Sequence, residues 1–228
     1  MAVFDLHVHT TKGSSDSSLT PQQLLERALE LRLDGVCLTE HGGGWDQREI
    51  DRVFSTSELT VLAGLEVETE MGHVLVYGMR SYVNGMSTVR DLRRAVDRAG
   101  AVMVSAHPFR NLFDRKPNTR NLLFPDSSKG PTTARQAADH PLFDIVDDVE
   151  VVNGGNTEEE NRFAVDLARD LGMKGTGGSD AHSTHGLGGC LTVLDGDVRT
   201  EGDLIEVLKA KAFTPVQRLE NGDPAAFS

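Results

Sequence analysis

Short apolar segments alternate with amphipathic segments along most of the chain, and this alternation restricts the fold more than any other feature. Apolar runs predict strands at residues 2–8, 35–39, 61–67, 73–77, 101–105, 149–152 and 190–194, and a segment at 175–179 leads into a turn. Helices are predicted between them, beginning near Thr20, Thr88, Thr157 and Thr200. Strands that alternate with helices are typical of βαβ units, so we expect an α/β fold with a mainly parallel sheet.

The four predicted helix starts share a capping signal. Each threonine is followed three positions later by Gln, Asp or Glu, at Gln23, Asp91, Glu160 and Asp203. In a capping box, the two side chains satisfy each other's free backbone N–H groups. These pairs therefore indicate where each helix begins.

A stretch between residues 110 and 141 interrupts the alternation. It contains four prolines and shows little hydrophobic periodicity. A long irregular stretch inside a compact domain is usually a functional loop, a lid or a disordered segment. We expect one domain over residues 1–219, with residues 110–141 as an irregular insertion or lid and residues 220–228 as a tail.

The charge balance restricts the partners of the chain. It contains 23 basic and 35 acidic residues, which gives a formal net charge of -12. An extended nucleic-acid-binding surface needs an excess of Lys and Arg, so we expect none. A small phosphorylated substrate stays compatible with this charge, because bound divalent cations reverse the local field.

No apolar run approaches the roughly 20 residues of a membrane-spanning helix. The first residues lack a basic region followed by a long apolar one, so a cytoplasmic location is expected. Cys37 and Cys190 lie in apolar segments and are expected to be buried thiols rather than a disulfide. The sequence carries no signal of oligomeric state.

Six of the eight histidines lie in or just after a predicted segment of this alternation: His7, His9, His41, His73, His107 and His182. In a parallel α/β barrel the strand C-termini form the active site, so these histidines indicate a functional centre at one rim. His7 and His9 are two residues apart on a strand and share a face, so both can reach one metal ion.

Carboxylates accompany these histidines. Glu66 lies in a strand suited to burial, where a lone carboxylate is costly unless a cation accompanies it. Glu68 shares its face and is an alternative ligand, or else a solvated residue. Asp180 and His182 form a second pair of this kind, directly after glycines that permit a close backbone approach. Imidazole and carboxylate ligands together suit Zn, Mn or Fe.

Five motifs, in this order, resemble those of the PHP (polymerase and histidinol phosphatase) family: DLHVHT at 5–10, TEH at 39–41, GLE at 64–66, AHP at 106–108 and GSDAH at 178–182. The resemblance spans roughly residues 5 to 190. It implies a distorted (β/α)7 TIM-like barrel with two or three divalent cations, Mn, Zn or Fe, at the strand C-termini. It also implies a metal-dependent phosphoesterase.

By position, six residues resemble the ligands of the closely spaced metals: His7, His9, Glu66, His107, Asp180 and His182. Glu66 corresponds to a bridging carboxylate. Asp16 and His41 resemble ligands of a third metal, and His73 either completes that site or binds phosphate. Asn153 stands where many relatives offer a further His, and is expected to orient water or substrate.

In the expected mechanism, a hydroxide that bridges two cations attacks phosphorus, and a neighbouring His protonates the leaving group. We place His41, His73, Asp180 and His182 among the catalytic residues. Arg110, three residues after His107, either grips the phosphate through its planar fork or is a surface residue. His185 either faces the site as a substrate-binding residue or lies on the surface.

The expected substrate is a small phosphorylated metabolite or a nucleotide. An amidohydrolase-like enzyme that cleaves C–N or ester bonds is the alternative, because such barrels also begin with H-x-H. They usually carry a mid-chain Lys ligand and an isolated late Asp. Here no Lys stands at a mid-chain strand end, and the late motif is D-x-H. A second alternative is a degenerate metal-binding module without activity.

Overall fold

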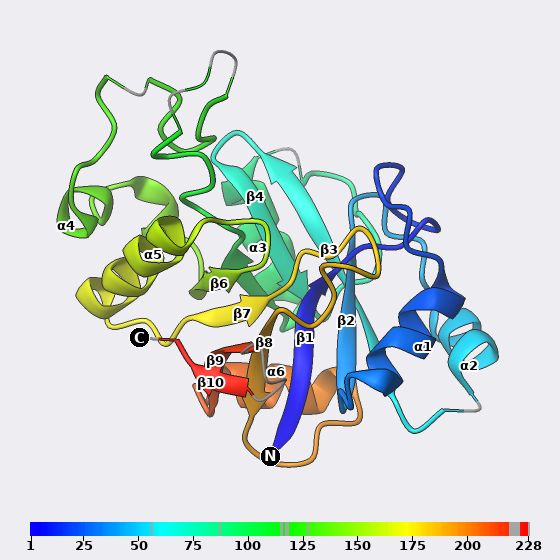
Figure 1. Ribbon diagram of the computed structural model, residues 1–228. Helices are drawn as coiled ribbons and strands as arrows, with labels where there is room; N and C mark the ends of the chain where they lie inside the picture. Colours follow the sequence, from blue (N-terminus) through cyan, green and yellow to red (C-terminus); the bar gives the residue numbers. More distant parts are fainter. Residues whose placement is uncertain are drawn as a thin grey trace.

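The computed structural model describes residues 1–55, 57–86, 88–114, 116, 119–126, 128–218 and 224–227. One ten-stranded sheet runs through the molecule, and helices pack around it (Figure 1). In chain order the elements are β1 (Ala2–Val8), α1 (Pro21–Glu30), β2 (Gly35–Glu40), α2 (Gln47–Phe54), β3 (Thr60–Thr69), β4 (Gly72–Tyr77), α3 (Val89–Ala99), β5 (Val102–Ser105), α4 (Ala134–Ala137), the 3-10 helix η1 (Pro141–Asp144), β6 (Asp148–Asn153), α5 (Glu158–Leu171), β7 (Thr176–Gly178), β8 (Cys190–Leu194), α6 (Glu201–Lys209), β9 (Phe213–Arg218) and β10 (Pro224–Ala226).

Strands β1 to β7 curl into a nearly closed barrel. They follow one another in sequence order across the sheet, and the segment after β7 returns to the end of β1. A parallel bridge joins Val8 to Ala181 there, and the Asp180 N–H donates to the carbonyl of His7 at 2.7 Å. The expected distorted TIM-like barrel is confirmed. Strands β8, β9 and β10 extend the sheet outward from the first half of β1.

The sheet is mixed, so the expectation of a mainly parallel sheet is wrong. Pairs β1–β2, β2–β3, β5–β6 and β6–β7 are parallel, whereas β4 runs antiparallel to both of its neighbours. The reason is the short turn at residues 70–71, which makes β3 and β4 a hairpin with Thr69 opposite Gly72. No crossover helix fits in such a turn.

The four predicted helices form, and their threonine caps are confirmed. Thr20, Thr157 and Thr200 make capping boxes, and Thr88 accepts the backbone N–H three residues later. Helix α2 was not predicted, because it is short and buries few apolar side chains. Its capping box between Asp46 and Glu49 is the sequence signal that could have revealed it.

Between residues 110 and 141, the described residues are mostly irregular and include α4, and the part before α4 projects from the barrel (Figure 1). Asn121 ties this segment to the barrel: its amide donates to the carbonyls of Pro108 and Arg110, and its carbonyl accepts the N–H groups of Leu123 and Phe124. Residues 115, 117, 118 and 127 lie outside the described residues. So do residues 219–223 and 228 of the expected tail, while β10 within that tail pairs with β9.

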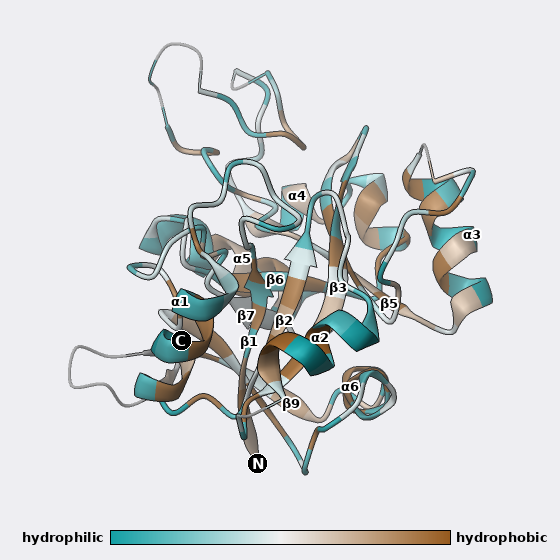
Figure 2. Ribbon diagram, turned by 90° about the vertical axis from the view of Figure 1, so that its right-hand side faces the viewer, coloured by the Kyte–Doolittle hydropathy of each residue, from teal (hydrophilic) through white to brown (hydrophobic). Residues whose placement is uncertain are grey.

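Hydrophobic residues predominate along the strands, and the helices carry both hydrophobic and hydrophilic residues (Figure 2). The buried hydrophobic side chains come from the strands and from one side of the helices. Phe4, Leu6, Leu75 and Tyr77 belong to the cluster that fills the barrel at the end away from the histidines. This close packing makes the barrel rigid, so that the strand ends that carry the histidines hold their side chains in fixed positions. Within the described residues, no helix has the length and apolar character needed to cross a bilayer.

Candidate metal centre

Histidines and carboxylates gather at one rim of the barrel, where β1, β2, β3, β5 and β7 end. Strand β4 runs the other way, so its first residues lie at this rim. His73, the second residue of β4, therefore pairs with Glu68 of β3 and lies beside Glu66. Among the described residues, three groups of potential ligands result, and within each group the ligand atoms lie within 4.8 Å of one another.

The first cluster comprises His7, His9, Glu66 and Asp180. The Nε2 atoms of His7 and His9 lie 3.0 Å apart. His9 Nε2 lies 3.1 Å from Glu66 Oε2 and 3.2 Å from Asp180 Oδ1, and His7 Nε2 lies 3.3 Å from each of the same two oxygens. Two imidazole nitrogens and two carboxylate oxygens thus converge on one buried point, an arrangement that fits a divalent cation of the Zn, Mn or Fe type.

The second cluster comprises Glu66, His73 and His107. Glu66 Oε1 lies 2.9 Å from both His73 Nδ1 and His107 Nε2, while its other oxygen faces the first cluster. Glu66 thus belongs to both clusters, as expected of a bridging carboxylate.

The third cluster comprises His9, His41 and His182. Asp16 lies beside it, with Oδ2 3.5 Å from His41 Nε2 and 3.4 Å from His182 Nε2. The geometry groups His182 with Asp16 and His41, and His73 with the closely spaced pair. The sequence resemblance had grouped His182 with the closely spaced ligands, and had left His73 either to complete the third site or to bind phosphate.

The buried carboxylates are held ionised by the histidines around them. Burial opposes ionisation of Glu66, but the charge of His7 and hydrogen bonds from His107 hold its pKa well below the usual value. The pKa of Asp180 is also lowered well below its usual value, because His7 and His9 outweigh its burial. Burial likewise disfavours charge on His7, yet Asp180, Glu150 and Glu66 raise its pKa well above the usual value. A proton on His7 therefore balances negative charge of these carboxylates that a bound cation would otherwise balance.

Two further buried carboxylates support the ligands, and sequence reasoning missed both. Glu150 of β6 accepts from His7 Nδ1 at 2.9 Å, from the His107 N–H at 2.9 Å and from the Asn153 amide at 2.8 Å. Asp5 accepts the N–H groups of Ser179 and Gly188, and burial raises its pKa to about 6. Each is an acidic residue inside an otherwise buried strand, which is the signal that drew attention to Glu66.

The backbone at the rim is strained and closely packed. His107 and Asp180 have φ values of 28° and 54°, a backbone region that residues other than glycine rarely adopt. A Cβ on Gly178 would lie 2.4 Å from the Cβ of His7, so only glycine allows β7 this close to β1. The expected close approach at this glycine is confirmed.

Arg110 lies beside the first cluster, with 30% of its side chain exposed. Its guanidinium donates to Asp180 Oδ2 and to Asn153 Oδ1, both at 2.6 Å, and to Asn156 Oδ1 at 3.3 Å. The amide of Asn153 is engaged on both sides, because its nitrogen donates to Glu150. Asn153 therefore links Arg110 to the carboxylate that supports His7.

Three other residues lie apart from the clusters. Glu68 is exposed. His185 is exposed and lies with Thr184 against the side chains of α1. His140 caps η1 by accepting the Leu142 N–H.

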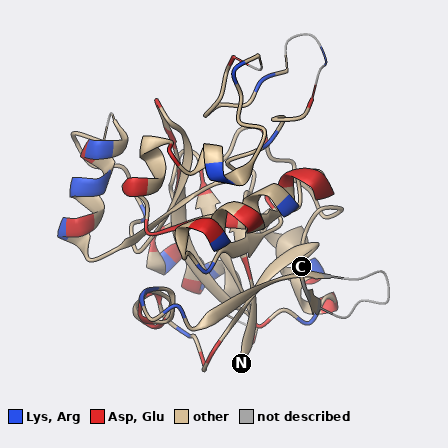
Figure 3. Cartoon of the chain, turned by 90° about the vertical axis from the view of Figure 1, so that its left-hand side faces the viewer, with Lys and Arg blue, Asp and Glu red and all other residues tan. Residues whose placement is uncertain are grey.

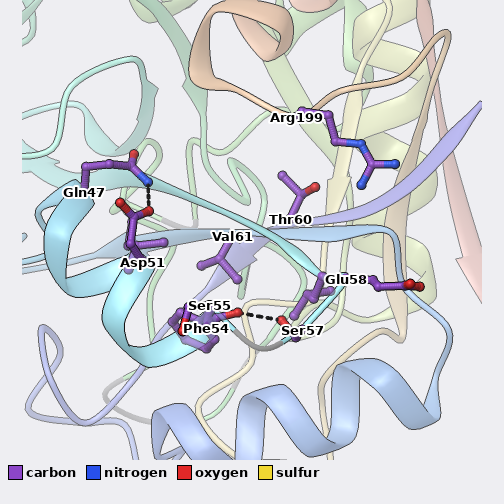
Figure 4. A pocket seen from close by; sticks show the side chains of 11 residues that line it. Gln47, Asp51, Phe54, Ser55, Ser57, Glu58, Thr60, Val61 and Arg199 are labelled. Atoms are coloured by element: carbon purple, nitrogen blue, oxygen red, sulfur yellow. Dashed lines mark hydrogen bonds between the residues drawn. The ribbon is translucent and has the colours of Figure 1, made fainter.

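Two cavities are relevant. A cavity of about 560 Å³ lies between α2 and residues 57–61, with Arg199 at its edge, and none of its lining residues belongs to the clusters (Figure 4). A smaller one, of about 170 Å³, adjoins the second cluster and is lined by His73, Ala106, His107, Pro108, Arg110, Asn111, Arg120, Asn121, Leu122 and Leu123. Only the second can place a bound molecule against the candidate ligands.

The family model for the PHP domain matches residues 5–123, and the model described as PHP-associated matches residues 158–213. Among curated proteins, the 5'-3' exoribonuclease Rnm of Escherichia coli (strain K12) is 37% identical over 71 residues, which are 29% of this chain and 23% of Rnm. The match thus spans less than a quarter of that relative.

Two solved structures resemble the whole chain. PsfC from Pseudomonas syringae PB-5123 has a TM-score of 0.64 at 20% identity, covering 97% of this chain and 93% of its own. A two-domain protein from Bacteroides vulgatus ATCC 8482, described as containing a predicted PHP-like metal-dependent phosphoesterase, has a TM-score of 0.64 at 19% identity, covering 94% of this chain and 64% of its own. At such identities the likeness shows the fold. Because the PHP model matches more than half of the chain, the chain belongs to the PHP domain family.

Proposed function

We propose that the chain hydrolyses phosphoesters of small phosphorylated metabolites or nucleotides, with two or three divalent cations bound at the rim. The observation that carries this proposal is the position of Glu66, whose two carboxylate oxygens face different ligand clusters. Bound there, divalent cations supply an activated water at neutral pH and offset the charge that develops on the phosphoryl oxygens.

The exposure of the candidate ligands suggests which of them hold the centre together and which can exchange protons. His7, His9 and Glu66 are at most 1% exposed and hold the centre together, whereas the side chains of His41 and His182 are 33% and 31% exposed. With two cations bound, His41 and His182 remain free to exchange protons with the leaving group. With three, both are ligands together with Asp16. Burial lowers the pKa of His41, so a smaller fraction of its ring carries a proton at neutral pH.

We assign substrate binding to Arg110, with Asn153 holding its guanidinium in place. The Arg110 side chain borders both the first cluster and the cavity of about 170 Å³. Its planar fork can contact phosphoryl oxygens without occupying a ligand position. His73 lines the same cavity and is 26% exposed, so it contacts the substrate side of the centre as well.

The cavity beside His73 supports a small substrate with an organic leaving group. Arg110 and Arg120 supply positive charge, and Leu122 and Leu123 supply an apolar wall. None of the described carboxylates forms an ion pair with Arg120. A phosphorylated molecule whose leaving group carries further negative charge, such as a nucleotide, matches this lining.

A nuclease is the second candidate, because the relative Rnm is named as an exoribonuclease. In Figure 3, Lys and Arg positions are interspersed with Asp and Glu positions along the helices, and the formal net charge of -12 leaves no excess of basic residues for a continuous basic surface. Long nucleic acids need such a surface. This favours mononucleotides or the end of a short oligonucleotide over a polymer.

The test is a substrate panel on protein loaded separately with Mn, Zn and Fe. It contains p-nitrophenyl phosphate, bis(p-nitrophenyl) phosphate, nucleoside monophosphates, 5'-phosphorylated oligoribonucleotides of increasing length, and p-nitrophenyl acetate. Turnover of phosphoesters that disappears in Glu66→Gln supports the proposal. Turnover of the acetate alone would favour the amidohydrolase-like alternative. Stoichiometric metal binding without any turnover would favour a degenerate metal-binding module.

A further inference from the structure

Glu40, the last residue of β2, is a buried carboxylate that belongs to none of the three clusters found among the described residues. Its oxygens accept from the Thr10 N–H at 3.0 and 3.1 Å, from the Thr10 hydroxyl and from Trp45 Nε1 at 2.9 Å. A fourth group, the hydroxyl of Ser14, donates to Glu40 Oε2 at 2.6 Å. These hydrogen bonds from four donor groups fix the buried carboxylate in place.

The Ser14 hydroxyl connects Glu40 to the metal centre. Its single hydrogen is given to Glu40, and its oxygen accepts the backbone N–H of His41 at 3.1 Å. The ring nitrogen Nδ1 of His9 lies 3.0 Å from the same oxygen. Because a hydroxyl has one hydrogen and two acceptor positions, Nδ1 of His9 must be the donor in this contact.

The lone pair of a neutral His9 therefore lies on Nε2. That nitrogen is the atom that faces Glu66 and Asp180 in the first cluster. The chain closes tightly over this arrangement, since a Cβ on Gly13 would lie 2.6 Å from the Cβ of Glu40. Ser14 and Glu40 are 2% and 0% exposed, so water does not compete for their hydrogen bonds.

We infer that Glu40, acting through Ser14, is a positioning residue that holds His9 in the tautomer whose Nε2 can bind a cation. The same hydroxyl accepts the backbone N–H of His41, so it also helps to position a residue of the third cluster. The inference rests on the proposed metal centre and adds to it a carboxylate–hydroxyl–imidazole chain that specifies one of its ligands.

Glu40→Gln should reverse this tautomer. The amide oxygen of Gln must take the position near Trp45 Nε1 and Thr10, because the opposite orientation would place N–H donors against each other. The amide NH₂ then faces Ser14 and donates to it. The Ser14 hydrogen is released and turns to Nδ1 of His9, which moves the ring proton to Nε2 and blocks that nitrogen.

The experiment uses the full chain, with Glu40→Gln, Ser14→Ala and a control, Thr39→Val. Thr39 directly precedes Glu40 and carries a buried hydroxyl without a hydrogen-bond partner among the described residues, so its loss should change neither His9 nor metal binding. The first readout is the ¹⁵N NMR tautomer of His9 in metal-free protein, at a pH where the ring is neutral, assigned with His9→Gln. The second is Mn²⁺ affinity by calorimetry, and thermal melts check folding.

We expect Nδ1–H in the parent and in Thr39→Val, and Nε2–H in Glu40→Gln. Mn²⁺ affinity should fall by about 10- to 100-fold in Glu40→Gln and in Ser14→Ala, the range found when partners of metal ligands are removed. An unchanged tautomer in Glu40→Gln, or parental Mn²⁺ affinity in a folded Ser14→Ala, would overturn the inference. Should Glu40→Gln fail to fold, Ser14→Ala decides through its Mn²⁺ affinity. A tautomer switch in a protein without phosphoesterase activity would instead contradict only the proposed function.

Discussion

Glu66→Gln is the substitution that tests the proposed centre most directly. The side chain is 1% exposed, and its oxygens lie 2.9 to 3.5 Å from the rings of five histidines: His7, His9, His41, His73 and His107. Glutamine keeps the shape but removes the negative charge and one acceptor. Two clusters lose their shared ligand at once, so both cations should bind more weakly.

The magnitude follows from what the shared carboxylate supports. Metal-ion catalysis contributes several kcal/mol, and a loss of ~4 kcal/mol lowers kcat/KM about 10³-fold. Asp16 is the comparison: its side chain is 58% exposed and reaches only the third cluster, at 3.4 and 3.5 Å. Asp16→Ala should cost roughly tenfold, or ~1.4 kcal/mol.

The assay measures kcat/KM on p-nitrophenyl phosphate in excess Mn²⁺, with metal content determined on the same samples. Glu68→Gln is the matched control, because Glu68 lies two residues along the same strand and is exposed. We expect Glu68→Gln to behave like the parent. Equal losses in Glu66→Gln and Asp16→Ala would refute the reasoning that Glu66 serves two cations.

Four further outcomes are expected. Metal analysis should find at least two divalent cations per chain; a value below one that dialysis against Mn or Zn does not restore would contradict the centre. In chelator-treated protein, Glu66 and Asp180 have lowered pKa values, so the stability that they contribute should be lost as the pH falls through those values. His7 has a raised pKa, so the stability that it contributes should be lost as the pH rises through its pKa in the folded protein. Melting temperatures with and without Mn²⁺ across pH measure both. Arg110→Ala should keep its metals but lower kcat/KM by about 1.5–3 kcal/mol, with Arg110→Lys recovering part; parental kinetics would make Arg110 a purely structural partner of Asp180. Arg120→Ala should raise KM for nucleotides with a second phosphate and leave KM for p-nitrophenyl phosphate unchanged; equal effects on both would exclude the cavity as a leaving-group site.

Most of the candidate ligands could be found from sequence because they stand in a strand at the rim or directly after one, whereas Asp16, in the segment between β1 and α1, came only from the family resemblance. His7 and His9 share a face on β1, and Glu66 is a charge in an otherwise apolar strand. Their grouping could not be found in the same way. Strand β4 is antiparallel, so His73 reaches the rim from the start of its strand, and only the pairing of β4 with β3 reveals that.

The supporting carboxylates were missed for a related reason. Glu40, Glu150 and Asp5 lie in strands beside the ligands, but a strand pattern does not say whether a carboxylate faces a cation or a set of hydrogen-bond donors. Burial without a partner would be too costly for any of the three. Sequence reasoning can therefore predict that each has a partner, and the structure is needed to identify it.

These carboxylates also explain why the centre can exist before a cation binds. Glu150 fixes His7 through Nδ1, and Glu40 fixes His9 through Ser14, so both rings of the H-x-H pair point Nε2 into the same cluster. Holding both rings in one orientation lowers the entropy that metal binding must overcome. The two supports come from different strands: β2 pairs directly with β1, and β6 pairs with β7. Barrel strands thus supply both supporting carboxylates, with Ser14 of the segment between β1 and α1 connecting Glu40 to His9, and the segment at 110–141 contributes mainly to the adjoining cavity.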